Sequence, residues 1–171
     1  MNKALYIALE ARLKESAVGI KYIDLFNNQL QNKQEVLSYP CVLIAYNAGY
    51  DSLSQGVQKA SLRLTFYLAI DITGLSSYEG SGNQASALAV FDTKDKIHQA
   101  LQGYSADFFT ALNRIEEIQD TDYQNIQVFQ LVYETELTDI AAWTGNQYIE
   151  VTGVEPEIEK EIDIENFNLR T

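Results

Sequence analysis

Hydrophobic and polar residues alternate most regularly in residues 60–73, which read ASLRLTFYLAIDIT. An apolar residue takes every second position from Leu62 to Ile72, and mostly polar residues stand between them. A side-chain period of two is that of a β-strand with one apolar and one polar face. Fourteen residues at ~3.3 Å each span roughly 46 Å, whereas the usual strand has only about 5–6 residues. The segment therefore predicts a strand that either centres a sheet or extends beyond its domain toward a partner.

The residues before this segment predict one helix and two further strands. Three leucines recur at helical spacing within residues 2–17, which indicates an amphipathic helix. Residues 20–26 alternate as in a partly exposed strand, and the apolar run 41–46 favours a strand that is buried on both faces. The polar residues 27–38 predict a surface loop. Residues 48–59, with two glycines and small polar residues, predict a hairpin loop that leads into the long strand.

The residues after the long strand predict a second helix and two more strands. Residues 74–84 are rich in serine and glycine and indicate a flexible connection. Residues 85–102 have helical periodicity, and the short aromatic segment 104–111 suggests one further turn of helix. Residues 112–119 and 126–137 predict paired strands, the second of them interior because both its faces are apolar.

This order of elements predicts an α+β fold. Strands that follow one another through short turns favour a mostly antiparallel sheet, here with two helices packed on one face and a long β-hairpin. We expect residues 1–140 to form this domain. Residues 141–171 form an acidic C-terminal extension in which acids alternate with isoleucines, and we expect this extension to become ordered against a partner.

Composition narrows the class of protein. The 171 residues are 46% hydrophobic, which suffices for a core, yet no apolar run approaches the ~18–20 residues of a membrane span. The formal net charge is −12 and no basic stripe occurs, so direct nucleic-acid binding is not expected. The N-terminus lacks the continuous apolar stretch of a secretory signal, which predicts intracellular synthesis. The single cysteine, Cys41, excludes an intramolecular disulfide.

Residues able to carry chemistry are few, and they form no catalytic pattern. His98 is the only histidine, with Asp95 one turn before it, and its position favours a helix-surface or edge-of-core histidine. Cys41 lies in an apolar strand, where cysteine is usually inert. Glu116 and Glu117 are neighbours on a predicted strand and so point to opposite faces. We therefore expect no catalytic residue, no metal and no cofactor.

An acidic domain with a long ribbon and two loops is typical of proteins that bind other protein chains. Strand edges that leave a domain can pair with neighbouring subunits, and head-to-tail repetition of such a contact closes a ring. The apolar face of residues 60–73 should cover the helices, and the opposite face should meet solvent or a neighbouring subunit. The interface candidates, taken from this opposite face, from the two loops and from the extension, are Tyr50, Asp51, Arg63, Thr65, Tyr67, Tyr78, Glu79, Trp143 and Tyr148.

Several segments in succession carry a resemblance to a known family. They are ALYIALEARL and IKYIDLF, then SYPCVLIAY, QGVQKASLRLTFYLAID, FDTKDKIHQALQGY and NRIEEIQDTDYQNIQVFQLVYETELTD. In this order they resemble the tail terminator (tail completion) proteins of long-tailed bacteriophages. The similarity covers about residues 1–140 and contains no catalytic signature, and the acidic extension lies outside it.

This resemblance implies a subunit that assembles into a ring, typically a hexamer, on the end of a tail tube. Such a ring halts polymerisation of the tail tube protein and presents the surface that joins the tail to the head-tail connector proteins. The protein would belong to the tail or neck of the virion, would be assembled in the bacterial host cytoplasm, and would have no membrane partner. The net charge of −12 adds a separate expectation: an acidic ring lumen would let DNA pass without binding, since like charges repel.

Two alternatives stay open beside this expectation. Another phage neck or baseplate ring component is compatible with the same fold, because fold alone does not fix function. A small-ligand-binding or enzymatic α+β domain is the alternative from another class. It would use a pocket between sheet and helix, with His98, Asp95 and nearby tyrosines.

Overall fold

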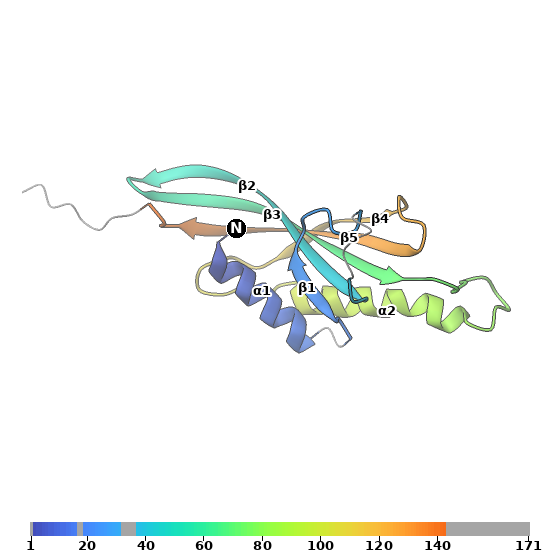
Figure 1. Cartoon of the computed structure of the whole chain (residues 1–171). Helices are drawn as coiled ribbons and strands as arrows, with labels where there is room; N and C mark the ends of the chain where they lie inside the picture. Colours follow the sequence, from blue (N-terminus) through green and yellow to red (C-terminus); the bar gives the residue numbers. More distant parts are fainter. Residues whose placement is uncertain (1, 17–18, 32–36, 143–171) are drawn as a thin grey trace, which may run out of the picture.

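The fold is seen in a computed structural model that describes residues 2–16, 19–31 and 37–142. Within these ranges the chain forms two helices and five strands, and Figure 1 shows their arrangement. In chain order the elements are α1 (Lys3–Ser16), β1 (Tyr22–Leu25), β2 (Cys41–Ser54), β3 (Val57–Asp71), α2 (Gln84–Leu101), β4 (Asn113–Asp120) and β5 (Ile126–Asp139).

The strands form one sheet in the order β1-β2-β3-β5-β4. The pair β1–β2 is parallel, and the other three pairs are antiparallel. β3 holds the centre of the sheet, and β5 is flanked by strands on both sides, as its two apolar faces indicated. The predicted α+β class with a mostly antiparallel sheet is therefore confirmed.

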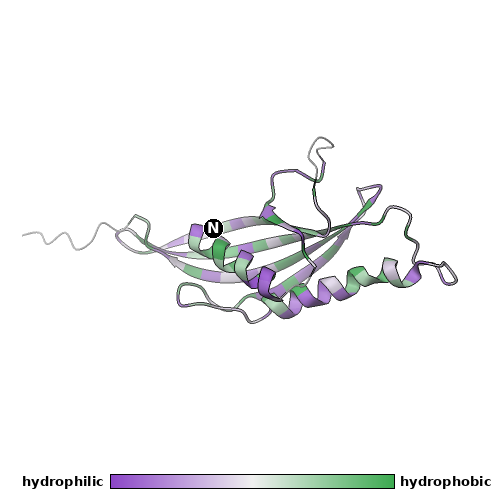
Figure 2. Ribbon diagram, turned by 60° about the horizontal axis from the view of Figure 1, so that its bottom comes forward, coloured by the Kyte–Doolittle hydropathy of each residue, from purple (hydrophilic) through white to green (hydrophobic). Residues whose placement is uncertain are grey.

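Both helices cover the same face of the sheet. The residues of β3 at every second position from Leu62 to Leu68 are buried on this face, where alternating hydropathy along the strands is visible in Figure 2. Leucines of α1 and the α2 residues Val90 and Ile97 belong to the same cluster. Phe66 meets Tyr133 of β5 edge-on, with the ring centroids 5.5 Å apart. The predicted packing of two helices on the apolar face of the long strand is confirmed.

The opposite face carries a second, smaller apolar cluster at the end of the sheet near β1. Cys41, Leu43 and Val128 are buried there. Phe26, which follows β1, lies flat on Tyr67 of β3 with the ring centroids 4.3 Å apart. The prediction that Tyr67 faces solvent or a neighbouring subunit is therefore wrong for this ring face, because a residue of the same chain covers it.

The hairpin between β2 and β3 is longer than the sequence predicts. Residues 48–54 were expected in a loop, yet β2 continues through them and pairs with β3. The turn is confined to Gln55 and Gly56, where Gly56 has φ +77°, a left-handed conformation that glycine adopts without steric cost. Small polar residues form a strand here because β3 supplies the hydrogen-bonding partner.

The aromatic segment 104–111 also differs from expectation. It forms no helical turn but a tight bend, closed by hydrogen bonds between the backbones of Ala106 and Phe109. Phe109 is buried and forms a β-bridge with Leu137 of β5. The backbone N–H of Thr110 donates to the carbonyl of Glu136 at 2.8 Å. The segment thus continues the sheet beside β5, beyond the start of β4.

Candidate assembly surface

The strands β2, β3 and β5 extend past the part of the sheet that α1 covers, as Figure 1 shows. We call residues 45–63 and 134–139 the arm. β1 pairs with β2 only from Cys41 to Ile44. No strand among the described residues pairs with the outer edge of β2 from residue 45 to 54, and we call this stretch the open β2 edge. Its unpaired backbone groups form a template for another strand.

Two tyrosines stand beside the open edge. Tyr46 lies opposite Leu64 and Tyr50 opposite Ala60, so both tyrosines are on the helix-side face of the sheet. Tyr46 is 51% exposed and Tyr50 is 49% exposed. A tyrosine offers a large contact area with a polar tip, and this residue type is enriched at protein interfaces. The arm thus combines an open edge with aromatic side chains.

The other face of the arm is charged, and its cations Lys59 and Arg63 are paired within the chain. Arg63 forms an ion pair with Glu116 of β4, and the ammonium of Lys59 lies 2.8 Å from a carboxylate oxygen of Glu136. These side chains are about half exposed, so each pair contributes at most ~1 kcal/mol to stability. Arg63 is available to a neighbouring subunit only if it exchanges Glu116 for another acid. Thr65, two residues further along the same face, is half-buried.

The loop before α2 lies at the opposite end of the molecule from the arm tip (Figure 1). It contains Tyr78, which is 71% exposed, and the exposed Glu79. The loop is organised around Asn83, whose side chain accepts from the backbone N–H of Ser76 at 3.1 Å and donates to the carbonyl of Gly74 at 2.6 Å. The described interface candidates therefore do not form one patch. Tyr50 and Asp51 lie on the arm, Tyr78 and Glu79 lie in the loop at the opposite end, and β3 carries Arg63, Thr65 and Tyr67 between them.

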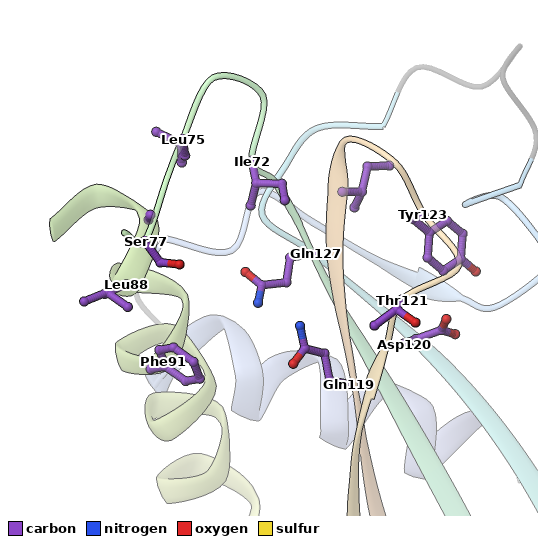
Figure 3. A pocket seen from close by; sticks show the side chains of 12 residues that line it. Ile72, Leu75, Ser77, Leu88, Phe91, Gln119, Asp120, Thr121, Tyr123 and Gln127 are labelled. Atoms are coloured by element: carbon purple, nitrogen blue, oxygen red, sulfur yellow. The ribbon is translucent and has the colours of Figure 1, made fainter. Parts of the chain in front are cut away.

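A groove of about 570 Å³ lies beside this loop, between the first turns of α2 and the base of the sheet. Leu88 and Phe91 of α2 face Gln119 and Gln127 across it in Figure 3. Both apolar side chains are partly exposed. In Figure 1 only the N-terminal end of α2 reaches past the sheet, and Phe91 still packs on Phe129 of β5, with the ring centroids 5.9 Å apart.

His98 lies at the edge of the core, as its sequence position favoured. Its Nδ1 is 3.0 Å from the hydroxyl of the fully buried Tyr133. Burial, together with the charge of Arg114, lowers the pKa of His98, while Asp95 and Glu117 oppose that shift. Burial raises the pKa of Tyr133 to about 12. The neutral imidazole and the protonated phenol thus form a hydrogen-bonded pair that joins α2 to β5.

The other residues considered for chemistry are engaged in structural roles. Burial raises the pKa of the Cys41 thiol to about 11, so it remains protonated and unreactive at neutral pH. Glu117 pairs with Lys94 of α2 at 2.5 Å, whereas Glu116 pairs with Arg63, so the two carboxylates do point to opposite faces. Across the part of the chain that the structure describes, no group of three or more His, Cys, Asp or Glu side chains could hold a metal ion.

Sequence reasoning located part of this surface. Tyr50 and Asp51 lie on the arm, but in a strand rather than in the predicted loop. Tyr46 was not predicted as an interface residue, because the apolar run of the strand was expected to end there. Its spacing of four from Tyr50 nevertheless places both side chains on one face of a strand. Trp143 and Tyr148 lie outside the described residues.

The chain was also compared with known proteins. Neither the protein-family models nor the curated protein sequences contain a match to it. Among the described residues, no helix is long and apolar enough to cross a membrane.

Proposed function

We propose that this chain is a structural virion protein that forms a ring at the head-proximal end of a phage tail. In this role it terminates polymerisation of the tail tube and joins the tail to the head-tail connector. The sequence resemblance over residues 1–140 supports the proposal, and the α+β fold with its long hairpin is compatible with it. The observation that carries the proposal is the arm, with its open β2 edge and two half-exposed tyrosines.

The arm favours assembly for a physical reason. An edge of ten residues that has no strand partner within the described part of the chain can add a strand from a neighbouring chain. Natural proteins usually protect edges that do not serve this purpose. If the edge docks on a different part of the next subunit, the contact is heterologous, and repeated rotation can close it into a ring. If it pairs with the same edge of a second copy, the contact is isologous and gives a dimer. The number of six subunits is what the family resemblance implies.

The charge of the chain supports the remaining part of the proposal, in which DNA passes through the lumen without binding. The formal net charge is −12, and the cations nearest the sheet, such as Lys59, Arg63 and Lys94, already pair with glutamates. A lumen lined by unpaired acids would repel phosphates. If variants with lysines in place of lumen acids still assembled and passed DNA normally, this part of the proposal would be lost.

Native mass spectrometry tests the ring. We expect the wild-type chain to form a closed oligomer and the double variant Tyr46→Asp/Tyr50→Asp to form mainly monomers, because two charges would be buried in the contact. Gln99→Asp, on an exposed position of α2, is the control and should assemble normally. A wild-type chain that stays strictly monomeric would contradict the proposal, and so would normal assembly of the folded double variant.

Co-sedimentation with purified tail tubes tests the position of the ring. A terminator should bind to tube ends and stop their elongation by tube protein. A ring that forms but neither binds tube ends nor stops their growth would instead favour another neck or baseplate component with the same fold.

A second function draws support from the groove beside α2. Its volume of about 570 Å³ lies within the range of small-ligand pockets, about 300–1,000 Å³. The groove contains neither His98 nor Asp95, the residues around which a ligand site was predicted. A monomeric chain that retains a metabolite in native mass spectrometry would favour this function over the ring.

A further inference from the structure

A second hollow, of about 600 Å³, lies at the tip of the arm between the hairpin, the end of β5 and residues 106–110. Its apolar surface is open to solvent. Leu53 is 59% exposed and Ile140 is 57% exposed, and Phe108 beside them is also exposed. Phe109 and Leu137, which are buried, form the inner part of the hollow. Large apolar side chains that gather around one concave site mark it as a place where another group docks.

The polar residues around the hollow narrow the kind of group that fits it. Lys59 and Glu136 form their ion pair there, and the exposed Asp107 adds a second carboxylate. An indole ring has an apolar body and one N–H donor that seeks an acceptor when it is buried. Its face also attracts a nearby ammonium group. The hollow offers an apolar floor, carboxylate acceptors and a cation, and so matches a tryptophan side chain.

The chain itself has such a side chain within reach of the hollow. Ile140 lines the hollow, and Trp143 follows three residues later. Each residue advances the chain by at most ~3.8 Å, so the Cα atom of Trp143 lies within about 11 Å of that of Ile140. We propose that Trp143 packs into the hollow of its own chain, with its indole N–H directed to Glu136 or Asp107. This contact needs no second subunit and goes beyond the proposed function.

The contact would have a consequence for the acidic extension. Residues 144–171 contain seven acidic residues against Lys160 and Arg170, a net charge of −7 + 2 = −5. With Trp143 held in the hollow, this charged segment starts at the arm tip, a few residues from the end of the open β2 edge. The anchor would also cover the exposed apolar residues of the tip, which otherwise favour unspecific association.

Trp143 is the only tryptophan, so its fluorescence in the full-length chain reports on this one position. We expect emission at a shorter wavelength than in the urea-unfolded chain, and collisional quenching by acrylamide that is several-fold weaker. Both properties should persist on dilution to concentrations at which native mass spectrometry detects only monomers. This dilution keeps the test independent of ring assembly, so that either proposal can fail alone.

Matched variants test whether the Trp143 side chain lies in the hollow. Leu53→Asp and Ile140→Asp should shift the emission toward that of the unfolded chain and raise the quenching several-fold. Leu88→Asp makes the same change at a partly exposed leucine of the other groove and should leave the emission unaltered. Circular dichroism shows which variants are folded. If a substitution in the hollow unfolds the arm, Trp143→Ser gives a second measurement, with faster amide hydrogen exchange expected in residues 106–110 and not in α2.

Three results would overturn the inference. The first is wild-type emission and quenching equal to those of the unfolded chain. The second is emission that neither Leu53→Asp nor Ile140→Asp alters, together with unchanged hydrogen exchange in Trp143→Ser. The third is a blue-shifted emission that disappears on dilution to monomers, because the environment of Trp143 would then come from a second copy of the chain.

Discussion

At the scale of single residues, the contact between His98 and Tyr133 shows how a polar pair is accommodated at the edge of the core. Tyr133 is fully buried, and its hydroxyl needs a partner, since an unpaired buried hydroxyl costs about 1–3 kcal/mol. The neutral imidazole supplies this partner, with Nδ1 as acceptor when Nε2 carries the proton. The contact with Tyr133 gives the lone histidine a structural role.

This pair predicts a pH dependence of stability. The pKa of His98 is lowered in the folded chain, so the unfolded chain takes up a proton first as the pH falls. The contribution of neutral His98 to stability is complete above about pH 6.5, the pKa of histidine in the unfolded chain. It is lost as the pH falls through the lower pKa of His98 in the folded chain. We therefore expect the free energy of unfolding, measured with urea, to fall between neutral pH and mild acid. This fall should be smaller for His98→Gln than for the wild type. Equal losses in the two proteins would contradict the prediction.

At the scale of elements, the sequence predicted both helices and the long strand β3. Each of these elements buries one side, which imposes a clear period on its hydrophobic residues. It did not predict residues 48–54 of β2. Their glycine, serines and aspartate have the composition of a loop, and only pairing with β3 makes them a strand. The sequence pattern also did not predict contacts between distant residues. Phe26 covers one face of the Tyr67 ring, and Glu116 pairs with Arg63, so both predicted interface residues already have partners within the chain.

Two glycines of the hairpin provide a matched test of the arm. Gly56 has φ +77°, so Gly56→Ala should destabilise the turn by about 1–2 kcal/mol. Gly49 has no such conformation, and a Cβ atom there would meet no atom within 4 Å, so Gly49→Ala should be neutral or slightly stabilising. For a chain of this size a loss of 1 kcal/mol lowers Tm by roughly 2–4 °C. Equal melting temperatures for the two variants would show that the turn does not limit stability.

At the scale of the whole molecule, the subunit has two distinct ends. The arm projects at one end, and the loop with Tyr78 and the groove beside α2 lie at the other. The helices cover the sheet between them on one face. A molecule with different surfaces at its two ends suits head-to-tail contacts better than symmetric pairing, which requires one self-complementary patch.

The ion pairs within the subunit lead to a prediction of how added salt changes oligomer formation. Lys59, Arg63, Lys94 and Arg114 are engaged with glutamates of their own chain, so each would have to give up that pair to bridge to a neighbour's acids. Six subunits of charge −12 would bring together 6 × −12 = −72 charges. Salt shortens the reach of this repulsion to about 10 Å at 0.1 M, so the oligomer should form more readily as salt is added. Analytical ultracentrifugation across a salt series measures this, and dissociation by added salt would instead indicate contacts held by ion pairs between subunits.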